Sequence, residues 1–73
     1  MNWKPYIAVD PKVLHRQPHI KGTRITVEVV LQNLAAGLTE EEIIGSYHSL
    51  NKEAIHAAVA YAEELVRGMN GKL

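Results

Sequence analysis

Apolar residues recur at helical spacing along the chain from about residue 26 onward. Four of them fall at positions i, i+3, i+4 and i+7 of one stripe, namely Val27, Val30, Leu31 and Leu34. This spacing predicts an amphipathic helix over about residues 27–36. Thr26 is a suitable N-cap, and Gly37 stands where a left-handed residue commonly ends a helix.

A second helix is predicted to begin directly after Thr39. The Thr39 side chain can cap the helix, and Glu42 three positions later completes a capping box. Leu38 before the cap and Ile43 at the fourth helical position form a hydrophobic staple, and the acidic first turn suits the helix dipole. We expect this helix to end near Tyr47, because the next cap follows closely.

The third helix is predicted to begin with a similar cap and hydrophobic staple. Asn51 is its predicted cap, with Leu50 and Ile55 in the staple positions. Its apolar stripe then continues through Ile55, Ala58, Val59, Ala62, Leu65 and Val66. The pattern stops there, so residues 68–73 are predicted to form a frayed tail.

The first 25 residues carry β-type signals instead. The runs 6–9 and 18–20 are short and β-prone, and Asp10-Pro11 is a turn signal between them. Residues 23–27 alternate as a half-buried strand would, so two or three short strands are predicted. The expected fold is mainly α and forms a single domain over residues 1–73. It consists of a β-containing basic arm (1–25), a three-helix core (26–67) and the tail.

Two helices joined by a tight turn, with a third helix in front, resemble the helix-turn-helix plan of DNA-binding proteins. A twenty-residue frame of this kind can start at Glu41. Its diagnostic places then hold Ile44, Gly45, Ser49, Leu50, Ile55 and Ala58. Gly45 is expected to let the two helices cross closely. The alternative is a helical hairpin that only packs the core of a dimer.

Composition limits the remaining possibilities. The chain has 73 residues and no cysteine, which excludes disulfides and thiolate zinc sites. A domain this small has a marginal core, so burial against a second copy is expected, and we predict a homodimer. No apolar run approaches the about 18–20 residues that span a bilayer, and no signal peptide is evident, so a cytoplasmic protein is expected.

The net charge is zero, but the two halves of the sequence differ. Residues 1–27 hold five Lys and Arg against one Asp, whereas residues 28–73 hold three against seven Glu. A basic half can steer an anionic partner, or it can pair with the acidic half of a second chain.

The outer face of the third helix is where a DNA reader would contact bases. We expect it to present Asn51, Lys52, Glu53, His56, Ala57, Ala60, Glu63 and Glu64. Asn51, Lys52 and His56 suit a base edge or a phosphate, whereas the carboxylates repel DNA. Further contacts would come from four arm cations, Lys12, Arg16, Lys21 and Arg24. The alternative is that this helix face is only solvated.

No catalytic or metal site is predicted. Pro18 separates His15 from His19, and His48 and His56 are isolated from other ligands. The serines lie in no recognisable nucleophile–base context. We therefore expect no enzymatic activity, no cofactor and no metal.

The run from Pro18 to Val27, with Asp10-Pro11 before it, resembles the signature of a small bacterial family, domain of unknown function 433. Later blocks extend the resemblance to about residues 7–65, namely Gly37–Ile43, Tyr47, Leu50 and Ala58–Ala62. The resemblance implies a β element before a helix-turn-helix-like fold, often dimeric. Members of the family are frequently similar to antitoxins that bind operator DNA and hold a toxin resembling PIN-domain ribonucleases.

The chain departs from that family pattern at three positions. Arg16 stands where glycine is common, Thr26 where proline is frequent, and His48 where proline often ends the second helix. Within the shared run, Gly22 permits a positive-φ turn, Thr23 can bond to nearby backbone, and Arg24 offers a fork of donors. Arg24 is expected either to grip a phosphate or to pair with a glutamate. A protein-interaction module that no longer reads DNA is the alternative function.

Overall fold

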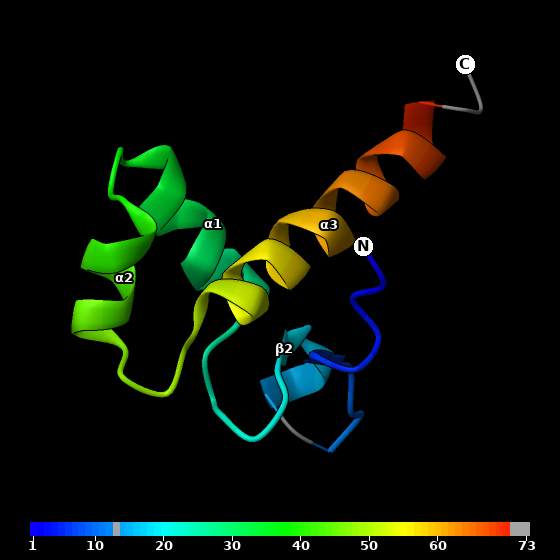
Figure 1. Cartoon of the computed structure of the whole chain (residues 1–73). Coiled ribbons are helices and arrows are strands. Elements are labelled where there is room, and N and C mark those ends of the chain that lie inside the picture. The colour runs from blue at the N-terminus through cyan, green and yellow to red at the C-terminus, as the bar shows by residue number, and fades with distance from the viewer. Residues whose placement is uncertain (13, 71–73) are drawn as a thin grey trace.

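The computed structural model describes residues 1–12 and 14–70, and it confirms a mainly α fold with a small β element (Figure 1). The elements in chain order are β1 (Ile7–Ala8), a short 3-10 helix η1 (Leu14–Arg16), β2 (His19–Ile20), α1 (Val27–Ala35), α2 (Glu40–Ser46) and α3 (Lys52–Asn70). All three predicted helices are present. The connection between α2 and α3 is somewhat longer than expected, because α2 ends at Ser46 and Tyr47 is its C-cap.

The caps form as the sequence predicts. Thr26 accepts a hydrogen bond from the Val29 amide at 3.1 Å and starts α1. At the other end of α1, Gly37 adopts a φ of +93°, and its amide and that of Leu38 bond back to the carbonyls of Leu34 and Asn33. This pattern is a Schellman motif, which satisfies carbonyls that the helix itself leaves unpaired.

The starts of α2 and α3 are capped in the same way. The Thr39 side chain accepts from the Glu42 amide at 3.1 Å, and the Glu42 carboxylate accepts from the Thr39 amide at 2.9 Å, which completes the capping box. Asn51 accepts from the Ala54 amide at 2.8 Å. Local hydrogen bonds therefore fix where both helices begin.

The β element is an antiparallel ladder that pairs Ile7 with Ile20 and Ala8 with His19. The third strand predicted over residues 23–27 does not form. The chain turns at Gly22, whose φ is +78°, and only an isolated bridge between Thr26 and His19 remains before α1 begins. The reason is that Thr26 already serves as the helix cap.

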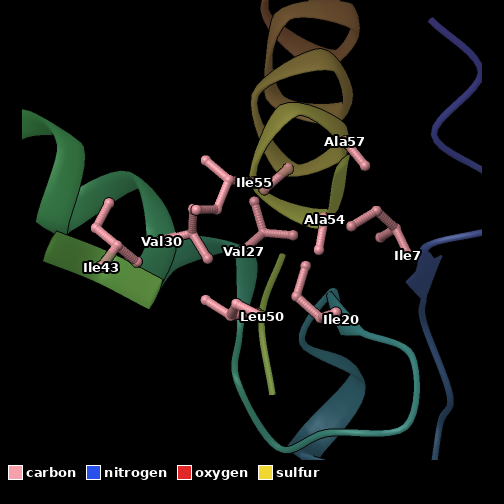
Figure 2. Close-up of a cluster of buried hydrophobic side chains, with 10 residues drawn as sticks. Ile7, Ile20, Val27, Val30, Ile43, Leu50, Ala54, Ile55 and Ala57 are labelled. Carbon is pink, nitrogen blue, oxygen red and sulfur yellow. The ribbon is translucent and has the colours of Figure 1, made fainter. Parts of the chain in front are cut away.

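The core lies where the three helices and the ladder meet (Figure 2). Its buried members are Ile7, Ile20, Val27, Val30, Ile43, Leu50, Ala54, Ile55, Ala57 and Ala58. Ala57 was expected on the exposed face of α3, and that expectation is wrong. The β element packs against this side of α3, and Figure 2 shows Ala57 on the side where Ile7 lies.

Two further expectations need correction. Gly45 does not mediate a close helix crossing, because it is exposed and a Cβ built there meets no atom within 4 Å. The tail predicted for residues 68–73 is helical as far as Asn70, and residues 71–73 lie outside the described part of the chain. In the second half of α3, Val59, Leu65 and Val66 of the predicted core stripe are exposed.

Because the surroundings of Gly45 are open, we expect the protein to accommodate a larger side chain there. Gly45→Ala should raise the free energy of unfolding by about 0.5–1 kcal/mol, because alanine has the better helix propensity and nothing obstructs its methyl group. Urea unfolding followed by circular dichroism measures this change. The matched control, Gly37→Ala, should lower stability by about 1–2 kcal/mol, because its φ is left-handed. A loss of stability in Gly45→Ala would contradict the open packing.

Candidate nucleic-acid interface

The bend between α2 and α3 brings the start of α3 to the surface in the manner of a helix-turn-helix. Leu50 and Ile55 are buried and anchor the bend and the first turn of α3 in the core. Lys52, Glu53 and His56 are then exposed on the other face of the helix. The frame predicted from Glu41 is therefore correct at its apolar positions around the bend and wrong at Gly45.

The start of α3 offers fewer free donors than the sequence suggests. Asn51 uses its side-chain oxygen to cap the helix, and this bond holds the side chain against the Ala54 amide. Lys52 Nζ lies 3.4 Å from Glu41 Oε2, and His56 Nε2 lies 2.5 Å from Glu40 Oε2. Carboxylates of α2 therefore face two of the three side chains at the start of α3 that were predicted to contact DNA.

The pairing also affects the titration of the partner on α2. The pKa of Glu41 is lowered from its ordinary value of 4.5, first because its carboxylate accepts a hydrogen bond from its own backbone amide and second because Lys52 lies beside it. A carboxyl with a lowered pKa in the folded state stabilises the fold above its ordinary pKa. That contribution is lost as the pH falls through the lowered value.

The cations of the arm lie in a different setting. Lys12, Arg16, Lys21 and Arg24 are exposed, and they lie on described segments that flank β2, namely residues 10–12 and 14–17 before it and 21–25 after it. Figure 1 places these segments at the end of the molecule where α3 begins. Within residues 1–12 and 14–70, none of these four cations takes part in an ion pair.

The loop that carries Lys21 and Arg24 has a defined conformation. The Thr23 hydroxyl donates to the Ile20 carbonyl at 2.8 Å and accepts from the Ile25 amide at 3.0 Å. With Gly22 in the left-handed region, these bonds fix the turn and hold Arg24 outward. The alternative expectation, that Arg24 pairs with a glutamate, is not met among the described residues of this chain.

Arg16 stands in a strained backbone segment. Leu14, His15 and Arg16 have φ values of 51°, 53° and 67°, all in the left-handed region. This conformation costs a non-glycine residue roughly 1–2 kcal/mol. The glycine common at this position in the resembled family fits the same backbone without that cost.

The four histidines have separate environments. His19 is buried in β2 with Nδ1 3.1 Å from the Gln17 carbonyl, and His48 is exposed with Nε2 2.8 Å from the Gly45 carbonyl. His15 lies in η1, and His56 pairs with Glu40. Among the described residues, no three His, Cys, Asp or Glu side chains cluster closely enough to hold a metal ion.

The far half of α3 has contacts that the sequence did not suggest. The Trp3 ring meets Tyr61 edge to face at 4.7 Å, and its Nε1 donates to the Glu64 carboxylate. Arg67 forms a bidentate pair with Glu63, with bonds of 2.9 and 3.0 Å. Glu63 and Glu64 thus bind partners within the chain, about three turns from the start of α3. A lone tryptophan before β1 was the only sequence signal for the Trp3 contact.

None of the helices in the described part of the chain is both long and apolar enough to cross a membrane.

Comparison with known proteins identifies relatives but no activity. The family model described as "Protein of unknown function (DUF433)" matches residues 7–62. The chain is also 35% identical over 57 residues to "Uncharacterized protein y4eO" of Sinorhizobium fredii (strain NBRC 101917 / NGR234). This match covers 78% of the chain but 26% of the relative, so the chain spans about a quarter of that protein's length. No solved structure matches the chain.

Replacing Lys52 tests whether α2 holds the cations of α3. Lys52→Gln should raise the pKa of Glu41 toward its ordinary value, but not fully, because the bond from its own amide remains. An NMR titration of the side-chain carboxyl measures this pKa. An unchanged pKa would show that Lys52 does not pair with Glu41 in solution.

A second substitution tests the strain at Arg16. Arg16→Gly should raise the free energy of unfolding by about 1 kcal/mol, because glycine adopts the left-handed region without a steric cost. Lys12→Gly is the matched control, since it removes a cation from the same loop at a position without a positive φ. Equal effects of the two variants in urea unfolding would contradict the strain.

Proposed function

This chain belongs to the DUF433 family of proteins of unknown function, and from that premise we propose that it is a small DNA-binding protein of antitoxin type. In this proposal it binds operator DNA as a dimer, without catalysis, and acts in the cytoplasm. Its second task is to neutralise a partner toxin resembling PIN-domain ribonucleases, and this part rests on the family resemblance alone.

The observation that carries the DNA-binding proposal is a set of four exposed cations on the loops of the β element, Lys12, Arg16, Lys21 and Arg24, which form no ion pair among the described residues. Figure 1 places these loops at the end of the molecule where α3 begins. Phosphate contacts provide most of the non-specific affinity for DNA, and exposed Lys and Arg side chains supply them. The fixed turn at Thr23 presents Arg24 with little loss of freedom on binding.

The start of α3 has a smaller part in this proposal than a typical recognition helix. Lys52 and His56 must leave Glu41 and Glu40 before they can contact DNA. Exposed ion pairs of this kind contribute little to stability because water and salt screen them, so their loss on binding costs little. The carboxylates stay in place and limit how closely this helix approaches the duplex, so the arm supplies the main contacts.

The same ion pairs favour a second candidate function. A helix-turn-helix scaffold whose outer helix is neutralised by Glu40 and Glu41 suits a protein-interaction module that no longer reads DNA. The zero net charge of the chain agrees with this alternative. The two candidates differ in one measurable property, which is salt-dependent binding to DNA.

Substitutions in the arm test the leading candidate. Lys21→Ala and Arg24→Ala should each weaken binding to a duplex taken from upstream of the chain's own gene, since each removes a phosphate contact. Each should also reduce the slope of log affinity against log salt by about 1. Fluorescence anisotropy titrations at several salt concentrations provide both quantities.

Lys4→Ala is the matched control, because Lys4 is an exposed cation that belongs to neither loop. It should leave the affinity and the salt slope nearly unchanged. Equal losses in all three variants would show only a general charge effect and contradict a site on the loops that flank β2. No binding at low salt, together with stable co-purification with the product of the neighbouring gene, would instead establish the interaction module.

A further inference from the structure

The second half of α3 exposes a row of large apolar side chains. Exposed fractions are 42% for Val59, 53% for Leu65, 54% for Val66 and 71% for Met69. Only two other large apolar side chains are exposed among the described residues, Met1 and Val9. Figure 1 shows the reason, since the outer half of α3 projects beyond the other helices.

An open groove accompanies this row. It has a volume of about 540 Å³ between α1 and α3 and is lined by Leu31, Val59, Ala62, Glu63, Val66 and Arg67. The family match ends at Ala62, so Leu65, Val66 and Met69 lie outside the part of the chain that the family model describes. Half of the residues that line the groove, namely Glu63, Val66 and Arg67, therefore lie outside that part.

We propose that a second copy of this chain docks here, with the outer halves of the two α3 helices packed antiparallel. The inference takes from the proposed function only the premise that two copies pair. It assigns that pairing to one surface, defined by Leu31, Val59, Ala62, Val66 and Met69, which we call the α3 stripe.

The spacing of the stripe on α3 favours a second copy. Val59, Ala62, Val66 and Met69 are separated by three, four and three residues, so the pattern is identical when read in either direction. An antiparallel copy therefore presents the same spacing, with Val59 opposite Met69 and Ala62 opposite Val66. A smaller side chain then faces a larger one, so the two rows can interdigitate.

The charges at the edge of the stripe are also self-complementary. Glu63 and Arg67 border the groove and neutralise each other within one chain. The antiparallel arrangement brings the two Glu63–Arg67 pairs together around the twofold axis. The two carboxylates and two guanidinium groups sum to zero charge, so the edges meet without net like-charge repulsion.

The area of a stable dimer sets how much of this face the second copy must cover. A stable interface covers about 800 Å² of each partner, roughly a sixth of the 5103 Å² that this chain exposes. The stripe runs from residue 59 to residue 69 of α3, about 15 Å of helix, and Leu31 widens it onto α1. The interface must therefore include the flanking side chains of Glu63, Leu65 and Arg67 as well as the stripe.

The test compares two valines of nearly equal exposure. Val66→Glu places a charge in the stripe, and Val9→Glu places the same charge at an exposed site outside it. In sedimentation equilibrium, Val66→Glu should weaken self-association at least tenfold and Val9→Glu should leave it unchanged. Far-ultraviolet circular dichroism should show both variants folded, since both sites are exposed.

The relative orientation of the two α3 helices can be measured separately with spin labels. The chain contains no cysteine, so only an introduced cysteine takes up the label. Spin labels on Glu53→Cys should lie about 33 Å apart along the helix axis in the antiparallel dimer. A parallel pair would bring them to the helix spacing of about 8–10 Å. A monomeric wild-type chain, equal effects of the two valine variants, or the short distance would each overturn the proposal.

These outcomes are distinct from failure of the DNA-binding role. If the wild type dimerises through the stripe but binds no DNA, the proposed dimer surface is supported and the DNA-binding proposal is wrong. If Val66→Glu remains dimeric while the wild type binds DNA, the DNA-binding proposal is supported and the proposed dimer surface is wrong.

Discussion

Three aliphatic side chains from three different helices meet in the core, and the rest of the fold is arranged around that contact. Val30 of α1, Ile43 of α2 and Ile55 of α3 are the largest fully buried side chains. With nine and seven residues, α1 and α2 are shorter than the about 12–15 residues that make a helix even marginally stable alone in water. They persist because burial at this point stabilises them together. The same contact sets the bend between α2 and α3 and so presents the start of α3.

Much of this fold follows from signals that act over a few residues. Thr26, Thr39 and Asn51 each satisfy a backbone amide three positions ahead, so their positions alone locate the helix starts. Features that depend on contacts between distant parts of the chain could not be predicted from the sequence. The burial of Ala57 depends on where the β element packs, and Gly45 lies in open space because no other segment crosses there.

In the candidate interface, too, local features could be predicted from the sequence and contacts between helices could not. The sequence predicted exposed cations in the arm and bonds from Thr23 to nearby backbone, and the structure has both, whereas contact of these cations with DNA stays a prediction. It did not reveal that Lys52 and His56 face Glu41 and Glu40, since those pairs join two helices whose relative placement is set by the core. Capping and the helix dipole alone explained the acidic first turn of α2 in the sequence. The structure shows that the same run also neutralises the start of α3.

Helix α3 thus joins two surfaces of different character. At its start, the surrounding surface is polar and charged, and the loops of the β element add unpaired cations there. Toward its end, apolar side chains are exposed and the flanking charges are paired within the chain. A long-range attraction to an anionic polymer is strong only where cations are free, whereas close apolar packing is stable only where charge is balanced. The two ends of α3 therefore suit different partners, and a dimer formed at the outer end leaves the cationic end of each copy accessible.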